Sequence, residues 1–168
     1  RCKIRFLHFG GLNMKKCVFA GTFDPVTKGH EEIIKKCADL FDETVVALCI
    51  NVKKQAMFSV EKRLEFLRAV CKKYRGVKVV YHDGLLVDLM KKENATYYVR
   101  GLRNGRDYDY ENDINYINAE LMPEMVTIYV PCSAARVSVS STAVRELLNF
   151  NKDVSKYVPE EIVGLIQQ

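Results

Sequence analysis

A run of ten residues near the start of the chain has the composition of a phosphate-binding loop. The run, Gly21-Thr-Phe-Asp-Pro-Val-Thr-Lys-Gly-His30, leaves a short apolar stretch and enters a helical pattern. Thr22 offers a hydroxyl where the apolar stretch ends, and Gly29 allows close approach to the free N–H groups of a helix start. His30 lies at the same helix start, where it could donate a hydrogen bond to a phosphate oxygen. A capped turn with a structural histidine is the competing interpretation.

The same run resembles the signature of the nucleotidyltransferase superfamily, Thr/His-x-Gly-His. Thr27, Gly29 and His30 supply its three defined positions. The run matches neither the P-loop pattern GxxxxGK[ST] nor the dinucleotide fingerprint GxGxxG. These differences argue against a P-loop NTPase and against an NAD-dependent enzyme.

Two further polar segments each follow an apolar, strand-like run. Lys53 and Lys54 follow residues 44–50, and the pair is either a solvated turn or, beside the first motif, a pair of phosphate ligands. Val139-Ser-Ser-Thr-Ala-Val-Arg145 leads into a helix, whose free N–H groups lie beneath consecutive hydroxyls. This segment resembles the superfamily motif Ile-Ser-Ser-Thr/Ser-x-x-Arg, with Val139 in place of Ile.

Another segment is rich in hydrogen-bond donors and is more specific. Arg100-Gly-Leu-Arg103 follows a strand-like run and precedes Arg106 and Asp107-Tyr-Asp-Tyr-Glu111, the acidic first turn of a predicted helix. A surface loop that balances helix-end charge is the simpler interpretation. The combination of Arg-Gly-Leu-Arg with Asp-aromatic-acid-Tyr-Glu resembles one branch of the superfamily, the phosphopantetheine adenylyltransferases.

These segments need a scaffold that brings the ends of several strands together. Apolar runs and helical patterns alternate, which predicts a Rossmann-like α/β fold: one doubly wound domain with five buried parallel strands and helices on both faces. Ligands bind such sheets outside the carboxyl ends of the strands, near the point where the strand order reverses. The predicted strands are 17–20, 44–50, 77–81, 96–99 and 126–130, and the predicted helices are 29–40, 60–71, 85–92, 107–121, 140–149 and one that starts at Pro159.

Composition bounds the class of protein. The 168 residues, 48% of them hydrophobic, suffice for one globular domain and exclude a disordered chain. No apolar run reaches about 18 residues, so no membrane span is predicted. Six cysteines at positions 2, 17, 37, 49, 71 and 132 form no CxxC pair. We therefore expect no zinc site, and thiols that are buried or half-buried in a reducing cytoplasm.

Residues 1–13 do not resemble the rest of the chain, and we interpret them as a tag or an upstream remnant, with Met14 as the native start. They contain three basic side chains and no acidic one, so the net charge of +5 falls to +2 for residues 14–168. An excess this small does not favour a nucleic-acid partner. Residues 14–168 are expected to form one adenylyltransferase domain.

The resemblance extends over residues 14–168 and implies an enzyme of coenzyme A synthesis. Members of the family transfer the adenylyl group of ATP reversibly to 4′-phosphopantetheine, which gives dephospho-coenzyme A and pyrophosphate by direct attack. The resemblance further implies a cytoplasmic homohexamer that uses Mg²⁺, with coenzyme A as a candidate inhibitor. No residue is assigned to a metal, and neither a membrane nor a nucleic acid is expected as a partner.

The resemblance also assigns roles position by position. His30, Lys54 and Arg103 are the expected catalytic residues, with His30 stabilising charge on the α-phosphate. The expected 4′-phosphopantetheine contacts are Thr22, Lys54, Leu86 and Arg100. The contact of Phe23 with ATP is expected through its main chain. The expected ATP contacts are Thr22, Phe23, His30, Gly101, Leu102, Arg103, Glu111, Arg136, Val137, Ser138, Val139, Ser140, Ser141 and Thr142.

The residue types suit this chemistry. The nucleophile is already an anionic phosphate, so catalysis needs in-line positioning and charge stabilisation but no general base. Two positions depart from the family pattern. Thr142 replaces a frequent third serine and keeps its hydroxyl, whereas Gln55 replaces a frequent second lysine and is expected to weaken phosphate affinity.

Three alternatives compete with this interpretation. A nicotinamide or nicotinate mononucleotide adenylyltransferase shares the Gly-His and Ser-Ser-Thr motifs, and a cytidylyltransferase is a related candidate; the segment 100–111 disfavours both. A non-catalytic nucleic-acid-binding module would need a basic face with stacking aromatic side chains. Here the tyrosines are mixed with acidic residues, and that alternative leaves Thr22 and His30 unexplained.

Overall fold

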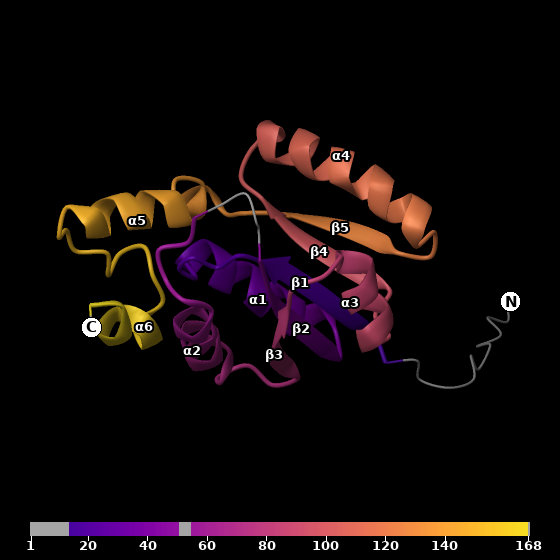
Figure 1. Ribbon diagram of the computed structural model, residues 1–168, viewed down its shortest axis with the longest axis horizontal. Coiled ribbons are helices and arrows are strands. Elements are labelled where there is room, and N and C mark those ends of the chain that lie inside the picture. Colours follow the sequence, from indigo (N-terminus) through magenta and orange to yellow (C-terminus); the bar gives the residue numbers. More distant parts are fainter. Residues whose placement is uncertain (1–13, 51–54, 168) are drawn as a thin grey trace, which may run out of the picture.

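Five parallel strands form the centre of the molecule, and helices flank them (Figure 1). The computed structural model describes residues 14–50 and 55–167. The strands are β1 (Lys16–Gly21), β2 (Glu43–Cys49), β3 (Val77–His82), β4 (Tyr97–Leu102) and β5 (Val126–Pro131). The helices are α1 (Lys28–Leu40), α2 (Val60–Cys71), α3 (Leu86–Glu93), α4 (Gly105–Leu121), α5 (Ser141–Asn149) and α6 (Glu160–Ile166), with a 3₁₀ turn, η1, at Ala134–Arg136.

The strand order is β3-β2-β1-β4-β5, with every neighbouring pair parallel. The chain builds outward from β1 to β3 and then crosses back to β4 on the other side of β1. β1 and β4 pair over Cys17–Phe19 and Tyr97–Val99, so they border the point where the strand order reverses. A ligand is expected at the carboxyl ends of these two strands.

Successive side chains of the inner strands point to opposite faces of the sheet, and each face has its own core. Phe19 and Leu48 belong to the larger core, which α1, α2, α5 and α6 cover. Val18 and Ala47 belong to the smaller core, which α3 and the residues that follow α4 cover. The predicted fold class, with helices on both faces of a five-stranded parallel sheet, is confirmed.

The sequence prediction was wrong about the end of the fourth strand. Arg100, Gly101 and Leu102 were expected in the loop after it, but they belong to β4 because they pair with Tyr129–Pro131 of β5. The following helix, α4, begins at Gly105, two residues earlier than predicted, because the side chain of Asn104 caps it by accepting the N–H of Asp107.

The five strands are also not equally buried. β1 and β2 are buried along most of their length, whereas the edge strands β3 and β5 are only partly buried. Each edge strand has a neighbour on one side only, so part of its surface remains open to solvent. No helix within residues 14–50 and 55–167 is long and apolar enough to cross a membrane. Cys17, Cys37 and Cys71 are buried free thiols, and Cys49 and Cys132 are half-buried ones.

Candidate active site

His30 is held at the start of α1 by a reciprocal pair of hydrogen bonds with Thr27. The Thr27 hydroxyl caps the helix by accepting from the main-chain N–H of His30 at 3.4 Å. In return, the main-chain N–H of Thr27 donates to Nδ1 of the His30 ring at 3.0 Å. Because Nδ1 accepts this hydrogen bond, the proton of the neutral imidazole lies on Nε2. The ring therefore has one donor, Nε2–H, to offer a ligand.

The surroundings of His30 keep its ring uncharged at neutral pH. Burial, together with the positive charges of Arg100 and Arg103, lowers its pKa from 6.5 to about 4. The ring of Phe23 packs against the imidazole in an edge-on arrangement, with the centroids 5.0 Å apart. Phe23 is only 1% exposed and has a φ of 43°. Its side chain belongs to the core, which is compatible with the expected ATP contact through the main chain.

The N-termini of α1 and α5 lie side by side. A Cβ atom placed on Gly29 of α1 would lie 3.8 Å from the carbonyl oxygen of Val139, just before α5. The main-chain N–H of Lys28 donates to the carbonyl of Tyr157 at 2.9 Å, and the main-chain N–H of His30 donates to the hydroxyl of Thr27. The N–H of Gly29 has no acceptor among the described residues. Two converging helix starts with free N–H groups favour an anion.

The three hydroxyls at the start of α5 all have partners within the chain. Ser140 Oγ accepts from the main-chain N–H three residues later at 3.1 Å and so caps the helix. Ser141 Oγ donates to the carbonyl of Pro25 at 2.8 Å, and Thr142 Oγ1 accepts from Arg145 at 3.2 Å. The sequence predicted these hydroxyls as phosphate ligands. They also shape the helix start, and phosphate binding stays a prediction, because Ser140 and Thr142 act only as acceptors in these bonds and keep an O–H to donate. The first N–H groups of α5 lack intrahelical acceptors.

Arg100 connects three elements where β1 and β4 border each other. Its Nη1 donates to the carbonyl of Ala20 on β1 at 2.7 Å, and its Nη2 pairs with the carboxylate of Glu111 on α4. The guanidinium also lies over the ring of Tyr98, 5.9 Å from its centroid. The Nε of Arg100 is buried and has no partner among the described residues.

Arg103 is bound by Asp107, which lies four residues further along the chain. Arg103 Nε and Nη2 donate to the two carboxylate oxygens at 3.0 and 3.1 Å, and its main-chain N–H donates at 3.0 Å. Burial raises the pKa of Asp107, but the bonds from Arg103 outweigh burial and lower it overall. An ATP phosphate would have to compete with this carboxylate for the guanidinium.

Two glycines of the predicted site differ in what the fold requires of them. A Cβ on Gly101 would lie 2.9 Å from Cγ1 of Ile33, because α1 packs directly on the main chain of β4. A Cβ on Gly29 would meet only ordinary contacts, at 3.6 and 3.8 Å. Gly101 therefore has a packing role that the resemblance did not predict, whereas the fold does not require a glycine at position 29.

The remaining predicted residues lie on segments that follow the carboxyl ends of β3 and β5. Leu86 is the first residue of α3 and is half-buried against the smaller core. The segment after β5 is anchored by Glu32 of α1, whose carboxylate accepts from the N–H and hydroxyl of Ser133 at 3.1 and 2.7 Å. This contact precedes residues 136–139, of which Val139 alone is buried. Lys53 and Lys54 lie outside the described residues.

Sequence reasoning gave no role to three charged residues around the loop between β1 and α1. Asp24 and Arg63 are 4% and 5% exposed, and Arg145 is half-buried. Asp24 stands inside the first motif, and Arg145 is the last defined position of the Ser-Ser-Thr motif, but neither was assigned a role. Arg63 shares its helical spacing with the apolar residues Leu67 and Val70, so a charge on the buried face of a helix was the available signal.

The site as a whole combines donors for anions at the carboxyl ends of β1 and β4. It offers a neutral imidazole N–H, two guanidinium groups and two helix starts, a set suited to a polyphosphate and to charge that develops during its reaction. Within residues 14–50 and 55–167, no three His, Cys, Asp or Glu side chains gather as a metal centre would require. Two surface hollows of about 490 and 650 Å³ lie along α5, and neither is lined by His30 or Arg100.

Comparison with known proteins identifies relatives over nearly the whole chain. The family described as cytidylyltransferase-like matches residues 18–147. A phosphopantetheine adenylyltransferase of Streptococcus agalactiae is 39% identical over 155 residues, which are 92% of this chain and 96% of that protein. The protein of the same name from Streptococcus pneumoniae is 43% identical over 151 residues, which cover 89% of this chain and 93% of the relative.

Solved structures show the same fold at lower identity. A putative nicotinate-nucleotide adenylyltransferase of Vibrio parahaemolyticus superposes with a TM-score of 0.67 at 20% identity, over 92% of this chain and 93% of the other. The nicotinic acid mononucleotide adenylyltransferase of Plasmodium falciparum, complexed with NaAD, gives 0.67 at 19% identity, over 92% and 95%. At this level of identity, the likeness concerns the fold alone.

Proposed function

The chain belongs to the phosphopantetheine adenylyltransferases of the cytidylyltransferase-like family, and from this premise we propose that it transfers the adenylyl group of ATP to 4′-phosphopantetheine. A phosphate oxygen of phosphopantetheine attacks the α-phosphorus of ATP. The bond from that phosphorus to the oxygen that bridges to the β-phosphate breaks, which releases pyrophosphate and leaves dephospho-coenzyme A. The observation that carries this assignment is the identity shared over 96% of the Streptococcus agalactiae relative.

The triphosphate is assigned to the two helix starts. The N–H of Gly29 and the first N–H groups of α5 are the main-chain donors that point out of α1 and α5 where these helices converge. Arg103 adds a guanidinium beside them once a phosphate displaces Asp107. We assign His30 to the α-phosphate. Its imidazole is neutral in the free enzyme, so it does not hold an anion before the substrate arrives, as an imidazolium would. The Nε2–H donor is then available to stabilise the negative charge that develops on the α-phosphate.

The acceptor is assigned to the other side of the loop between β1 and α1. Thr22 follows β1 directly, and the side chain of Arg100 on the adjacent β4 is partly exposed. Leu86 on α3 supplies apolar surface for the pantetheine arm, and Lys54 is proposed as a ligand of its phosphate. With both substrates bound as anions at adjacent strand ends, the attacking oxygen and the α-phosphorus can be held in line without a general base.

Magnesium is proposed to enter as the complex with ATP, as part of the substrate. The described residues do not form a cage of carboxylates, and the one buried carboxylate of the loop, Asp24, already accepts two main-chain N–H groups. Mg²⁺ commonly binds through substrate phosphates with few protein ligands. This donor set is compatible with a metal carried by the triphosphate, where Mg²⁺ would supply neutralisation of the phosphate charge.

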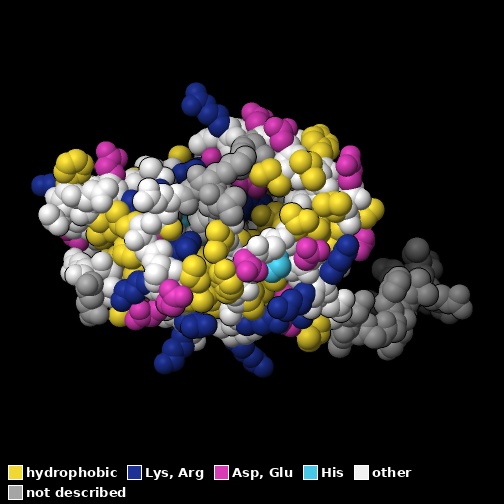
Figure 2. All heavy atoms as spheres, viewed as in Figure 1, with side chains coloured by type: hydrophobic (Ala, Val, Ile, Leu, Met, Phe, Trp, Pro, Cys, Tyr) yellow, Lys and Arg dark blue, Asp and Glu magenta, His cyan; other side chains and the backbone are white. Residues whose placement is uncertain are grey.

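A homohexamer is proposed as the assembly. The apolar side chains of α4 and the start of β5 are the supporting observation, since they are 38–64% exposed and gather on one side of the molecule (Figure 2). Exposed apolar patches of this kind mark surfaces that other chains cover. The residues concerned are Tyr108, Ile114, Tyr116, Ile117, Leu121 and Val126.

Two further properties belong to the same proposal. We propose that coenzyme A inhibits the enzyme, because it contains the product dephospho-coenzyme A and so fits the same donors. We also propose a cytoplasmic location, with which the free thiols of the five described cysteines are compatible.

One assay tests the proposed function directly. Pyrophosphate release from ATP is measured with 4′-phosphopantetheine and, as a control, with nicotinamide mononucleotide and nicotinate mononucleotide, since the similar solved structures carry the name of the second activity. We expect release with 4′-phosphopantetheine and little with the mononucleotides. Activity with a mononucleotide alone would overturn the proposal.

A further inference from the structure

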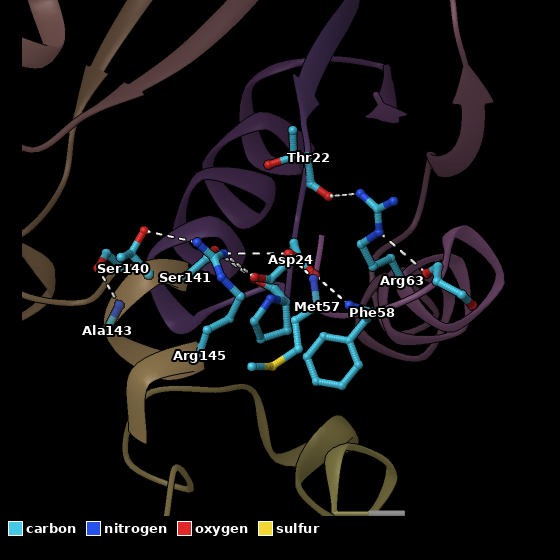
Figure 3. Close-up of polar contacts among 12 residues, drawn as sticks. Thr22, Asp24, Met57, Phe58, Arg63, Ser140, Ser141, Ala143 and Arg145 are labelled. Atoms are coloured by element: carbon cyan, nitrogen blue, oxygen red, sulfur yellow. Dashed lines mark hydrogen bonds and ion pairs between the residues drawn. The ribbon is translucent and has the colours of Figure 1, made fainter. Parts of the chain in front are cut away.

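Asp24 occupies a buried position at the centre of the loop between β1 and α1. Its side chain is 6% exposed, and both of its oxygens are used: Oδ2 accepts the main-chain N–H of Met57 at 2.9 Å, and Oδ1 accepts that of Phe58 at 3.0 Å. Figure 3 shows the main chain of Met57 and Phe58, on a separate segment, next to this carboxylate, while their side chains extend away from it. Asp24 thereby ties the β1–α1 loop to the chain that follows β2.

Arg145 ties the same loop to α5. Its Nη1 donates to the main-chain carbonyl of Asp24 at 2.6 Å and lies 3.6 Å from Oδ2 of the same residue. Its Nη2 donates to the hydroxyl of Thr142, in the first turn of α5, at 3.2 Å. Ser141 adds a second link through its hydrogen bond to the carbonyl of Pro25. Two side chains of α5 thus hold two consecutive carbonyls of the loop.

Arg63 holds the loop from the opposite side, as Figure 3 shows. Its Nη1 donates to the carbonyl of Thr22 at 3.0 Å, and its Nε donates to the carbonyl of Ser59 at 3.4 Å. The guanidinium therefore joins the loop to the start of α2. Three other segments therefore hold the loop: α2 and α5 bind its main-chain carbonyls, and the main chain of residues 57–58 binds the side chain of Asp24.

We propose that Asp24 is a positioning residue for the adenylyl transfer, and that it acts through Arg145 and the main chain of Met57 and Phe58. This inference rests on the proposed function. The loop that contains Asp24 begins with Thr22, assigned to the acceptor, and ends at the start of α1, assigned with α5 to the triphosphate. Asp24 thus sets the distance between the two substrates and does not contact either of them.

The proposal predicts a specific kinetic pattern. Each substrate alone is bound by groups other than Asp24, so its dissociation constant should depend little on that residue. The in-line approach of the two substrates depends on the relative placement of their segments, and a misplacement of about 1 Å can cost about 100-fold in rate. Loss of Asp24 should therefore lower kcat far more than it weakens the binding of either substrate.

The variant Asp24→Asn keeps the shape of the side chain while it removes the charge and one of two acceptors. We expect kcat to fall by about 100-fold per folded molecule, with the dissociation constants for a non-hydrolysable ATP analogue and for 4′-phosphopantetheine each changed by less than about threefold. Both constants are measured by calorimetry in separate titrations. Asp39→Asn is the matched control, since Asp39 forms an exposed ion pair with Lys35 on α1, and it should retain wild-type values.

A structural role alone gives a different result. In that case Asp24→Asn would lower the melting temperature while the remaining folded protein kept its wild-type kcat, and this would overturn the proposal. A parallel rise in one substrate's dissociation constant with the fall in kcat would also overturn it, because Asp24 would then serve a single binding site.

Arg145→Lys provides a second, independent test, which also applies if Asp24→Asn does not fold. Lysine keeps the charge but cannot donate to both Asp24 and Thr142, so we expect kcat to fall by about 10-fold with an unchanged dissociation constant for the ATP analogue. The double variant should lose less than the product of the two single losses, since the residues act as a unit. Additive losses, or weakened binding of the ATP analogue to Arg145→Lys, would contradict the proposal.

The outcome for Asp24 is separable from the outcome for the proposed function. The wild-type protein shows which acceptor supports pyrophosphate release, and that result alone decides the function. The ratio of variant to wild-type kcat is then taken with that acceptor, whichever it is, so a different acceptor leaves the test of Asp24 intact.

Discussion

The main-chain N–H of Thr27 donates to Nδ1 of His30 across 3.0 Å, and this contact determines which ring nitrogen has the proton. The donor is part of the peptide backbone, so no change of the Thr27 side chain removes it. The tautomer of the proposed catalytic histidine is consequently set by the geometry of the helix start. The capping box that begins α1 therefore also orients the ring of His30.

The first prediction concerns the titration of His30. Its pKa of about 4 means that the ring stays neutral through the physiological range. ¹⁵N NMR of the histidine rings should show His30 protonated on Nε2 alone until about pH 4, and a midpoint at pH 6–7 would contradict the assigned environment.

The same shift has a consequence for stability. An unfolded chain binds the proton near pH 6.5, whereas the folded chain binds it near pH 4. The contribution of His30 to stability is therefore fully present above pH 6.5 and is lost as the pH falls from 6.5 to 4. Denaturant unfolding at several pH values should show a smaller decrease over this interval for His30→Ala than for the wild type.

The second prediction concerns turnover. His30→Ala removes the proposed donor to the α-phosphate, and by analogy with an oxyanion-hole donor it should lower kcat by about 100–1000-fold. The fold and the assembly should survive, which circular dichroism and size-exclusion chromatography can check. Near wild-type turnover in a folded His30→Ala protein would exclude His30 from the reaction.

The third prediction concerns Gly29, where the surrounding structure has room for a Cβ atom. Ala at this position meets only ordinary contacts and favours the helix, so stability should stay equal or rise by up to about 1 kcal/mol. The methyl group would occupy the space next to the free N–H groups, and the affinity for an ATP analogue should fall by about 10-fold or more. Calorimetry measures the affinity, and unchanged binding would remove Gly29 from the ATP site.

The fourth prediction concerns Gly101, where the opposite result is expected. Ala there would place its Cβ 2.9 Å from Ile33 Cγ1, so Gly101→Ala should lower the free energy of unfolding by about 1–3 kcal/mol. In the double variant with Ile33→Ala the clash disappears, and the loss should be smaller than the sum of the two single losses. Wild-type stability of Gly101→Ala would show that α1 can move away from β4 without cost.

Much of the fold could be predicted because the inner strands are apolar on both faces. The runs 17–20 and 44–50 have no other plausible location than the centre of a sheet, and β1 and β2 form there. The end of β4 was missed because Arg100 and Gly101 are typical of loops. Pairing with β5 extends the strand through both residues, and a partner strand is a tertiary feature that no local pattern contains.

The site was predictable only where function leaves a sequence signature. Motifs led to His30 and Gly29, and the structure places Gly29 beside the start of α5 as the parallel sheet implies. The residues that bind the main chain of the β1–α1 loop lie far away in sequence: Arg145 is 121 residues from Asp24. Such pairings depend on how the segments pack, so sequence spacing offers no indication of them.

The larger core of the sheet also has a consequence for the order in which the protein can mature. Val154, Val158, Ile162 and Ile166 belong to the same apolar cluster as Phe19 and Ile33, which are synthesised far earlier. Lys73 adds ion pairs from the region after α2 to both Glu31 of α1 and Glu161 of α6. During synthesis α1 and α2 can cover this face of the central strands early, but the apolar cluster stays incomplete until residues 154–166 have been made.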